Sequence, residues 1–178
     1  TSQRGSELKV LSVDDGYMRW KPHGVCLVLA LDFLTKNQSA SFHPPEIFVP
    51  DITMHSDPTD DKFWCPVRTL KWYLARTKQL RGATSQLFIT TVRPHHAASR
   101  ETIARWFVSA IRFANVNWPS PSDNQVPRSI TAHNIRAFSA SWAFFRGVPM
   151  EDICKAGCWK TPSIFTLCYL LDALQREF

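Results

Sequence analysis

A histidine and an arginine in the C-terminal third of the chain are suited by type and spacing to binding a phosphate. His133 and Arg136 are three residues apart, so they would share one face of a helix. An arginine guanidinium can donate two parallel hydrogen bonds to a phosphate, and a histidine ring can donate another. Since such pairs are common on ordinary helix surfaces, the motif alone favours an exposed His–Arg pair.

Two aromatic residues follow this pair, Trp159 and then Tyr169. An indole N–H can only donate a hydrogen bond, and a tyrosine hydroxyl becomes a nucleophile once its proton is removed. Taken singly, each is more often a core residue. Their succession after His133 and Arg136 favours one shared site.

This order resembles the C-terminal signature of the tyrosine recombinases, the phage-integrase family: H-x-x-R, a later His or Trp, and a Tyr. The segment R-G-S-E-L-K-V-L beginning at Arg4 is similar to the family's first arginine motif, R-x-S-E-L-x-x-L. Lys36 follows a long apolar run, where the family keeps its β-hairpin lysine. The run 141–154 resembles most closely the recombinases of DIRS/Ngaro-type retrotransposons.

The resemblance implies a role for each matching side chain around one scissile phosphate. Arg4 and Arg136 would bind the non-bridging oxygens, where charge builds up in the transition state. His133 and Trp159 would add hydrogen bonds to the same group. Glu7 would orient Arg4 rather than react. We therefore expect Arg4, His133, Arg136 and Trp159 to converge on one concave basic patch.

The remaining two roles are those of nucleophile and general acid. Tyr169 would attack phosphorus and form a 3′-phosphotyrosyl bond, and Lys36 would protonate the departing 5′-oxygen. Cationic and neutral donors suffice for such a site, so we expect no metal and no other cofactor. The predicted function is DNA cleavage and rejoining in a mobile genetic element. The alternatives are a transposon-derived DNA-binding module without turnover and, third, an unrelated phosphate-binding enzyme.

Charge is distributed unevenly along the 178 residues, whose formal net charge is +6. Residues 61–118 hold ten basic and two acidic side chains, and residues 1–60 hold five and eight. Such a basic stretch is typical of a polyanion-binding face, although a solvated helix face has the same composition. With the resemblance, it predicts double-stranded DNA as the partner. The contacting residues expected are Lys78, Arg100, Arg105 and Arg112.

Composition bounds the class of protein. Aromatic residues make up 12% of the chain, too many for a disordered polymer. No apolar run approaches the roughly 20 residues needed to cross a bilayer, so no membrane partner is expected. The resemblance implies DNA as the substrate, so no small-molecule substrate is expected either. Five cysteines, an odd number, favour a reducing compartment, either the cytosol or the nucleus. With the resemblance to DNA recombinases, we expect the nucleus. We expect one catalytic domain over residues 1–178, without its core-binding domain and leading helix, monomeric alone and oligomeric on DNA.

The elements that must position these residues indicate an α+β fold, mainly helical, with a small antiparallel sheet near the N-terminus. Turn residues and apolar spacing predict three strands, at 18–20, 26–34 and 47–49. Capping residues and helical periodicity predict a first helix ending near residue 12 and then five more. These run from Pro66 to Gly82, from Ser99 to the connector 117–130, from 132 to 146, from Pro149 to Gly157, and from Pro162 onward.

Two further expectations concern side-chain packing. Cys154 and Cys158 are four residues apart, and core packing is favoured over metal binding because no further ligands have suitable spacing. In the last helix, an apolar stripe is expected to anchor the helix while Tyr169 turns toward Arg136. This stripe consists of Ile164, Leu167, Leu171 and Leu174.

Overall fold

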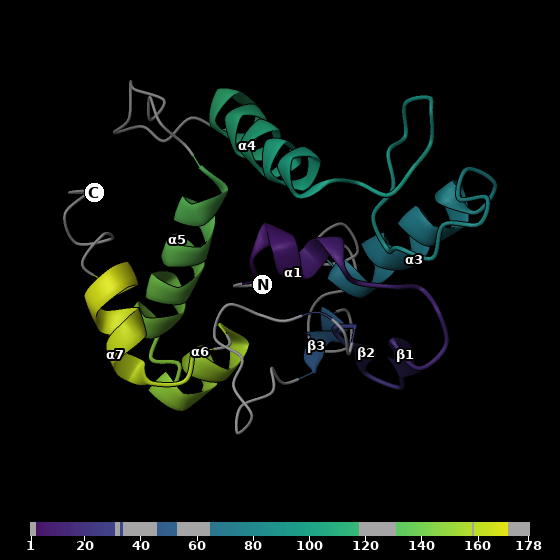
Figure 1. Cartoon of the computed structure of the whole chain (residues 1–178). Helices are drawn as coiled ribbons and strands as arrows, with labels where there is room; N and C mark the ends of the chain where they lie inside the picture. Colours follow the sequence, from purple (N-terminus) through teal and green to yellow (C-terminus); the bar gives the residue numbers. More distant parts are fainter. Residues whose placement is uncertain are drawn as a thin grey trace. The chain divides into compact units, whose positions relative to one another are not determined.

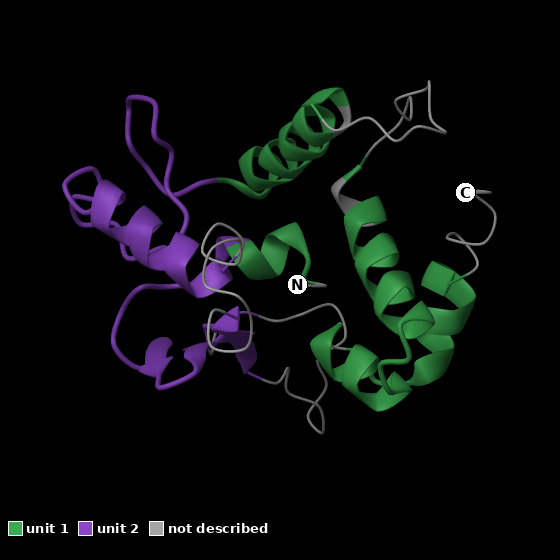
Figure 2. Ribbon diagram, turned by 180° about the vertical axis from the view of Figure 1, so that it is seen from behind, with its two compact units in different colours: residues 1–8, 36–43, 99–178 green, residues 9–35, 44–98 purple. Residues whose placement is uncertain are grey.

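The computed structural model describes residues 3–30, 33, 46–52, 65–117, 131–157 and 159–170, and it combines helices with one small antiparallel sheet (Figure 1). The predicted α+β class is confirmed. The chain forms two compact units (Figure 2). Unit 1 contains residues 1–8, 36–43 and 99–178, and unit 2 contains residues 9–35 and 44–98.

The sheet of unit 2 has three antiparallel strands in the order β1-β2-β3: β1 (Met18–Lys21), β2 (Gly24–Leu27) and β3 (Ile47–Pro50). Lys21 pairs with Gly24 across a two-residue turn. The predicted third edge strand is confirmed. The second strand is shorter than predicted, because it ends at Leu27 instead of reaching residue 34. Leu29, beyond this strand, is buried but does not belong to a strand. The apolar run therefore predicted burial correctly and the length of the strand incorrectly.

Helix α3 (Pro66–Thr77) also belongs to unit 2 and begins at Pro66 as predicted. It ends at Thr77 and not at Gly82, because Arg81 folds the chain back. The Arg81 guanidinium donates to the carbonyl oxygens of Gln86 (2.7 Å) and Leu87 (2.8 Å). Gly82 has a φ of +53° in the turn that follows, so the glycine marks that turn and not the helix end.

Unit 1 is helical. Its elements are α1 (Gly5–Lys9, whose last residue falls in unit 2), α4 (Arg100–Asn117), α5 (Ala132–Phe145), α6 (Met150–Ala156), α7 (Pro162–Phe165) and the π-helical η2 (Thr166–Leu170). The predicted caps are observed at two of these helices. Ser99 Oγ accepts a hydrogen bond from the backbone N–H of Thr102, and Thr131 Oγ1 accepts one from that of Asn134. Gly147, with a φ of +78°, follows the end of α5.

Aromatic rings form the core of unit 1. The Trp159 ring centroid lies 4.8 Å from that of Tyr169 and 5.5 Å from that of Phe165. Ala137 and Ala140 of α5 belong to the same buried cluster, and their small side chains leave room for these rings. The core therefore includes two of the predicted site residues.

The expected anchoring of the last helix is confirmed for Ile164, which packs against the core cluster, but it is wrong for Leu167. Leu167 is 68% exposed, whereas Phe165 and Tyr169 are buried. Both faces of this helix are apolar, so periodicity alone could not select the buried one. The aromatic face is buried because the Trp159 ring offers it a matching surface. Leu171 and Leu174 lie outside the described residues.

Cys154 packs in this core, as predicted, and Cys158 lies outside the described residues. Burial raises the pKa of the Cys154 thiol, which keeps it protonated and makes it a poor metal ligand. Among the described helices, none is long and apolar enough to cross a membrane.

Candidate phosphate-binding site

A buried carboxylate, that of Glu7 in α1, organises the candidate site of unit 1. Its residue is only 1% exposed. Glu7 Oε2 accepts the backbone N–H of Arg4 at 2.6 Å, and Glu7 Oε1 accepts from Arg4 Nη1 at 3.1 Å. A glutamate at the third helical position that reaches back to the residue before the helix closes the first turn. The same carboxylate therefore caps the N-terminus of α1 and holds the Arg4 side chain.

Arg136 reaches the same carboxylate from α5. Its Nη1 lies 3.5 Å from Glu7 Oε2, and its Nη2 donates to the carbonyl oxygen of Gly157. Arg136 is 3% exposed. Glu7 thus holds two guanidinium groups, although the sequence motif predicted a contact with Arg4 alone.

The predicted aromatic residues contact Arg136 directly. Arg136 Cζ lies 4.8 Å from the Trp159 ring centroid and 5.7 Å from the Tyr169 ring centroid, within the range of cation–π attraction. The indole Nε1 of Trp159 is buried and has no hydrogen-bond acceptor among the described residues. A buried donor without an acceptor is rare, because its desolvation is not compensated. A bound oxyanion that reached this N–H would supply the missing acceptor.

Gly157 belongs to this site, although its sequence position predicts only a helix end. Its carbonyl accepts the hydrogen bond from Arg136, and a Cβ on Gly157 would lie 2.4 Å from Cε3 of Trp159. The indole therefore packs directly on the Gly157 backbone. In the sequence, only its position two residues before Trp159 could have indicated that Gly157 belongs to the site.

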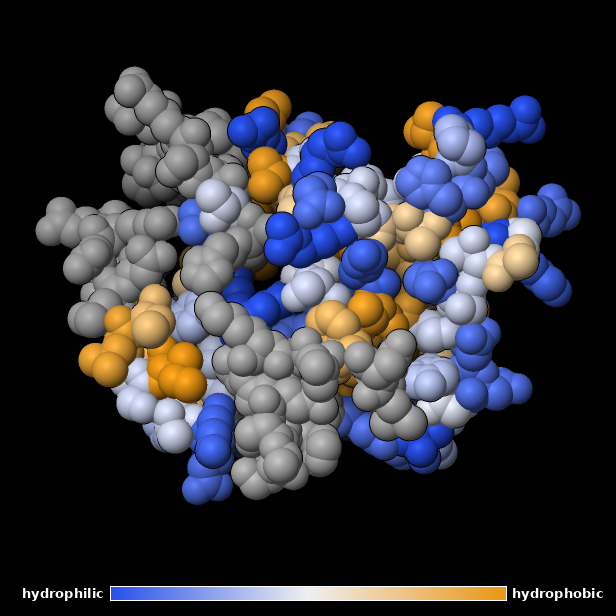
Figure 3. Space-filling model, in the orientation of Figure 1, coloured by the Kyte–Doolittle hydropathy of each residue, from blue (hydrophilic) through white to orange (hydrophobic). Residues whose placement is uncertain are grey.

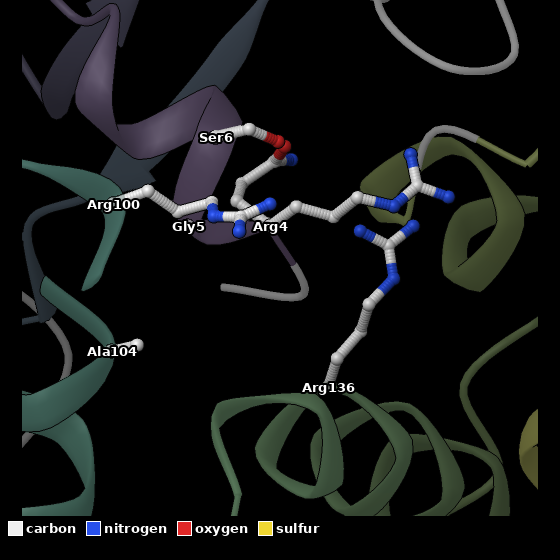
Figure 4. A pocket seen from close by; sticks show the side chains of 7 residues that line it. Arg4, Gly5, Ser6, Arg100, Ala104 and Arg136 are labelled. Atoms are coloured by element: carbon white, nitrogen blue, oxygen red, sulfur yellow. The ribbon is translucent and has the colours of Figure 1, made fainter.

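A pocket of about 290 Å³ opens beside these arginines (Figure 4). In Figure 4 the guanidinium groups of Arg4 and Arg136 point toward one another, and the Arg100 side chain extends alongside Arg4. The lining residues that the structure describes include three arginines and no carboxylate. They are Gln3, Arg4, Gly5, Ser6, Arg100, Ala104 and Arg136. Among the described residues, the Glu7 carboxylate pairs with both Arg4 and Arg136.

Arg100 enters this pocket from the first turn of α4. A Cβ on Gly5 would lie 3.2 Å from Arg100 Cγ, so the absence of a side chain there lets the arginine stem lie against α1. Arg100 Nε donates to Glu101 Oε1 at 3.1 Å. The pKa of Glu101 is lowered, first by a hydrogen bond from its own backbone N–H and then by Ser99 and Arg100. The terminal guanidinium nitrogens of Arg100 have no acceptor in the described part of the chain.

The structure thus brings together Arg4, Glu7, Arg136, Trp159 and Tyr169, and it adds Arg100 and Gly157. The remaining predicted residues are placed as follows. His133 belongs to α5, one turn before Arg136, but its side chain is not among those described. Lys36 lies outside the described residues. Arg105 and Arg112 are exposed on α4, and Lys78 is exposed after α3 in unit 2.

No family model matches the chain, and no curated protein or solved structure shows significant similarity to it. Among the described residues, no group of three or more His, Cys, Asp or Glu side chains could hold a metal ion. What the pocket can do follows from its guanidinium groups, which suit an oxyanion such as a phosphate.

Proposed function

We propose that the chain is the catalytic domain of a tyrosine recombinase from a retrotransposon-like element, which cuts and rejoins double-stranded DNA. One observation carries the proposal: Arg4 and Arg136 share the Glu7 carboxylate at a pocket whose described lining residues include no acidic side chain. Two guanidinium groups held in this way are prepared for the charge that develops on a phosphate during nucleophilic attack. An intracellular, nuclear location and an oligomer on DNA belong to the same proposal.

In the proposed reaction, the Tyr169 oxygen forms a bond to phosphorus and the bond from phosphorus to the 5′-oxygen breaks. The phenol gives its proton to water, and Lys36 gives a proton to the departing 5′-oxygen. The 3′-phosphotyrosyl bond keeps the energy of the DNA backbone. Attack by another 5′-hydroxyl reverses the step and rejoins the strand.

Arg4 and Arg136 would bind the non-bridging oxygens of this phosphate. The unpaired indole N–H of Trp159, next to Arg136, supports a third hydrogen bond to the same group. His133 would add a fourth, from the same helix as Arg136. Arg100 would contribute charge beside Arg4, along which its side chain extends (Figure 4).

The Tyr169 ring packs beside Arg136, but the residue is only 5% exposed. Attack therefore requires the hydroxyl to move out of the aromatic core on DNA binding. The π-helical segment that carries Tyr169 supports such a movement, since π turns are local irregularities often found at functional sites.

The same burial favours a second candidate function, a DNA-binding module that no longer turns over. In that case the pocket lined by Arg4, Arg100 and Arg136, which we call the arginine pocket, would still hold a backbone phosphate. Tyr169 would serve only as a core ring beneath Trp159 and Arg136.

A trapping experiment separates the two functions. The protein is incubated with a pool of nicked duplexes of random sequence, and covalent protein–DNA adducts are isolated under denaturing conditions. Wild type and Tyr73→Phe should both give an adduct, because Tyr73 lies in unit 2, where its hydroxyl contacts the backbone of Ile89. Tyr169→Phe should give none.

Each outcome decides between the functions. DNA binding by wild type without any adduct favours the binding module. An adduct that survives Tyr169→Phe contradicts the assigned nucleophile. Absence of both binding and adduct contradicts the DNA proposal itself.

A further inference from the structure

Helix α3 of unit 2 presents a basic face that the proposed reaction does not use. Arg68, Trp72 and Arg76 recur every four residues, and all three are exposed. Lys71 is exposed beside them. The twelve residues of α3 include no acidic side chain. Hydrophilic side chains project from the surface around α3 and the loop after it (Figure 3).

Two exposed tryptophans lie among these cations. Trp72 is 60% exposed, and Arg76 Cζ lies 4.9 Å from its ring centroid. Trp20 of β1 is 44% exposed, and Lys71 Nζ lies 5.3 Å from its ring centroid. Although each indole contacts one cation, about half of its surface stays exposed, so ring surface remains for stacking.

We propose that this surface, which we call the indole face and define as Trp20, Lys71, Trp72 and Arg76, binds single-stranded nucleic acid. Bases would stack on the open indole surfaces, and the cations would contact the phosphates between them. The proposal does not depend on Tyr169 chemistry. The indole face lies wholly in unit 2, whereas the arginine pocket lies wholly in unit 1.

The combination of groups distinguishes this ligand from other polyanions. The positive charge of α3 would attract any of them, including duplex DNA and sulfated polysaccharide. Exposed indole rings are suited to flat partners, and the bases of a duplex are already stacked on one another. Unpaired bases satisfy both features of the surface.

The test compares three fluorescent ligands by anisotropy at fixed salt: (dT)15, a 15-base-pair duplex and heparin. Trp72→Leu and Trp20→Leu should each weaken (dT)15 binding at least about fivefold, the loss of one stacked base. Heparin binding should stay unchanged, because it has no bases. Arg76→Gln should weaken binding of all three ligands.

Trp142 of α5 provides a matched control. It is 55% exposed, and Arg146 Cζ lies 5.5 Å from its ring centroid, but it belongs to unit 1. Trp142→Leu should leave (dT)15 binding unchanged. Circular dichroism and thermal midpoints should be measured to check that each variant is folded. If a tryptophan variant does not fold, Arg76→Gln still tests the indole face.

Three results would overturn the proposal: unchanged (dT)15 affinity in both tryptophan variants of the indole face, an equal loss in Trp142→Leu, or an equal loss for heparin. Failure of the adduct experiment with Tyr169 would leave these outcomes unaffected. The two proposals therefore fail separately.

Discussion

The carboxylate of Glu7 lies 3.5 Å from Nη1 of Arg136 while it also bonds Arg4. Glu7 and Arg136 are both almost completely buried. Burial of charges is tolerated when they are paired, and loss of one partner exposes the full desolvation cost of the other. Glu7 is therefore a structural requirement of the site as well as an organiser of its arginines.

Glu7→Gln should lower the free energy of unfolding by about 3–5 kcal/mol, the usual cost of breaking a buried ion pair. Glutamine keeps the size of the side chain and its ability to accept a hydrogen bond, so the loss reports charge. The measurement is urea unfolding followed by circular dichroism. Glu101→Gln is the control, since Glu101 pairs with Arg100 in solvent and should leave the unfolding midpoint unchanged.

Arg100→Gln should weaken duplex binding and reduce the slope of log K against log [salt] by about 0.9, the value for one phosphate contact. Because the Arg100 side chain is largely exposed, the thermal midpoint should stay the same. Arg136→Gln should differ by lowering both binding and stability. A steep, unaltered salt slope in Arg100→Gln would show that the arginine does not contact DNA.

Charge reversal at Lys78 or Arg105 tests the basic stretch 61–118. Both residues are exposed, and neither has an ion-pair partner among the described residues. Each reversal should weaken binding equally for all DNA sequences and make the salt dependence shallower. If several reversals together leave the slope constant, these charges serve only solvation.

The sequence predicted element types better than their packing. Ser99, Thr131 and Gly147 act through their own neighbours, so the positions of α4 and α5 followed from local rules. The buried face of α4 did not follow from such rules. Ile103 and Ala110 both belong to the apolar stripe that helical spacing predicts, yet Ile103 is buried and Ala110 is exposed. Which side of an apolar helix is covered depends on elements distant in the chain.

The candidate site was also predicted only in part, because its packing depends on contacts between elements that are distant in the chain. Arg4 and Arg136 were found because their motifs have defined spacing. The double use of Glu7 and the packing of Trp159 on Gly157 depend on contacts between α1, α5 and the segment after α6, which spacing does not encode. The burial of Tyr169 likewise required the ring partners to be known.

The cysteines should differ in reactivity. Burial raises the pKa of Cys154, whereas Cys168 is exposed. At pH 7.5 a thiol reagent should modify Cys168 rapidly and Cys154 only on unfolding, as peptide mass spectrometry would measure. The pKa of the Cys154 thiol is higher in the folded than in the unfolded protein. Its contribution to the free energy of unfolding is therefore constant below the unfolded pKa of about 8.5 and decreases as the pH rises above that value. Equal labelling rates would contradict its burial.

Gly157→Ala tests the junction of Arg136 and Trp159. Gly157 has an ordinary helical backbone, with φ of −86°, so alanine introduces no backbone strain. Its methyl group would instead overlap the Trp159 ring, where the nearest separation is 2.4 Å. Displacement of the indole should cost about 1–3 kcal/mol of unfolding free energy, as overpacking of a core does. It should also weaken duplex binding, because Trp159 and the Gly157 carbonyl both position Arg136. Lys155→Ala, at an exposed position two residues earlier, should change stability little and serves as the control. A Gly157→Ala protein with unaltered stability and binding would mean that the indole does not pack on this backbone.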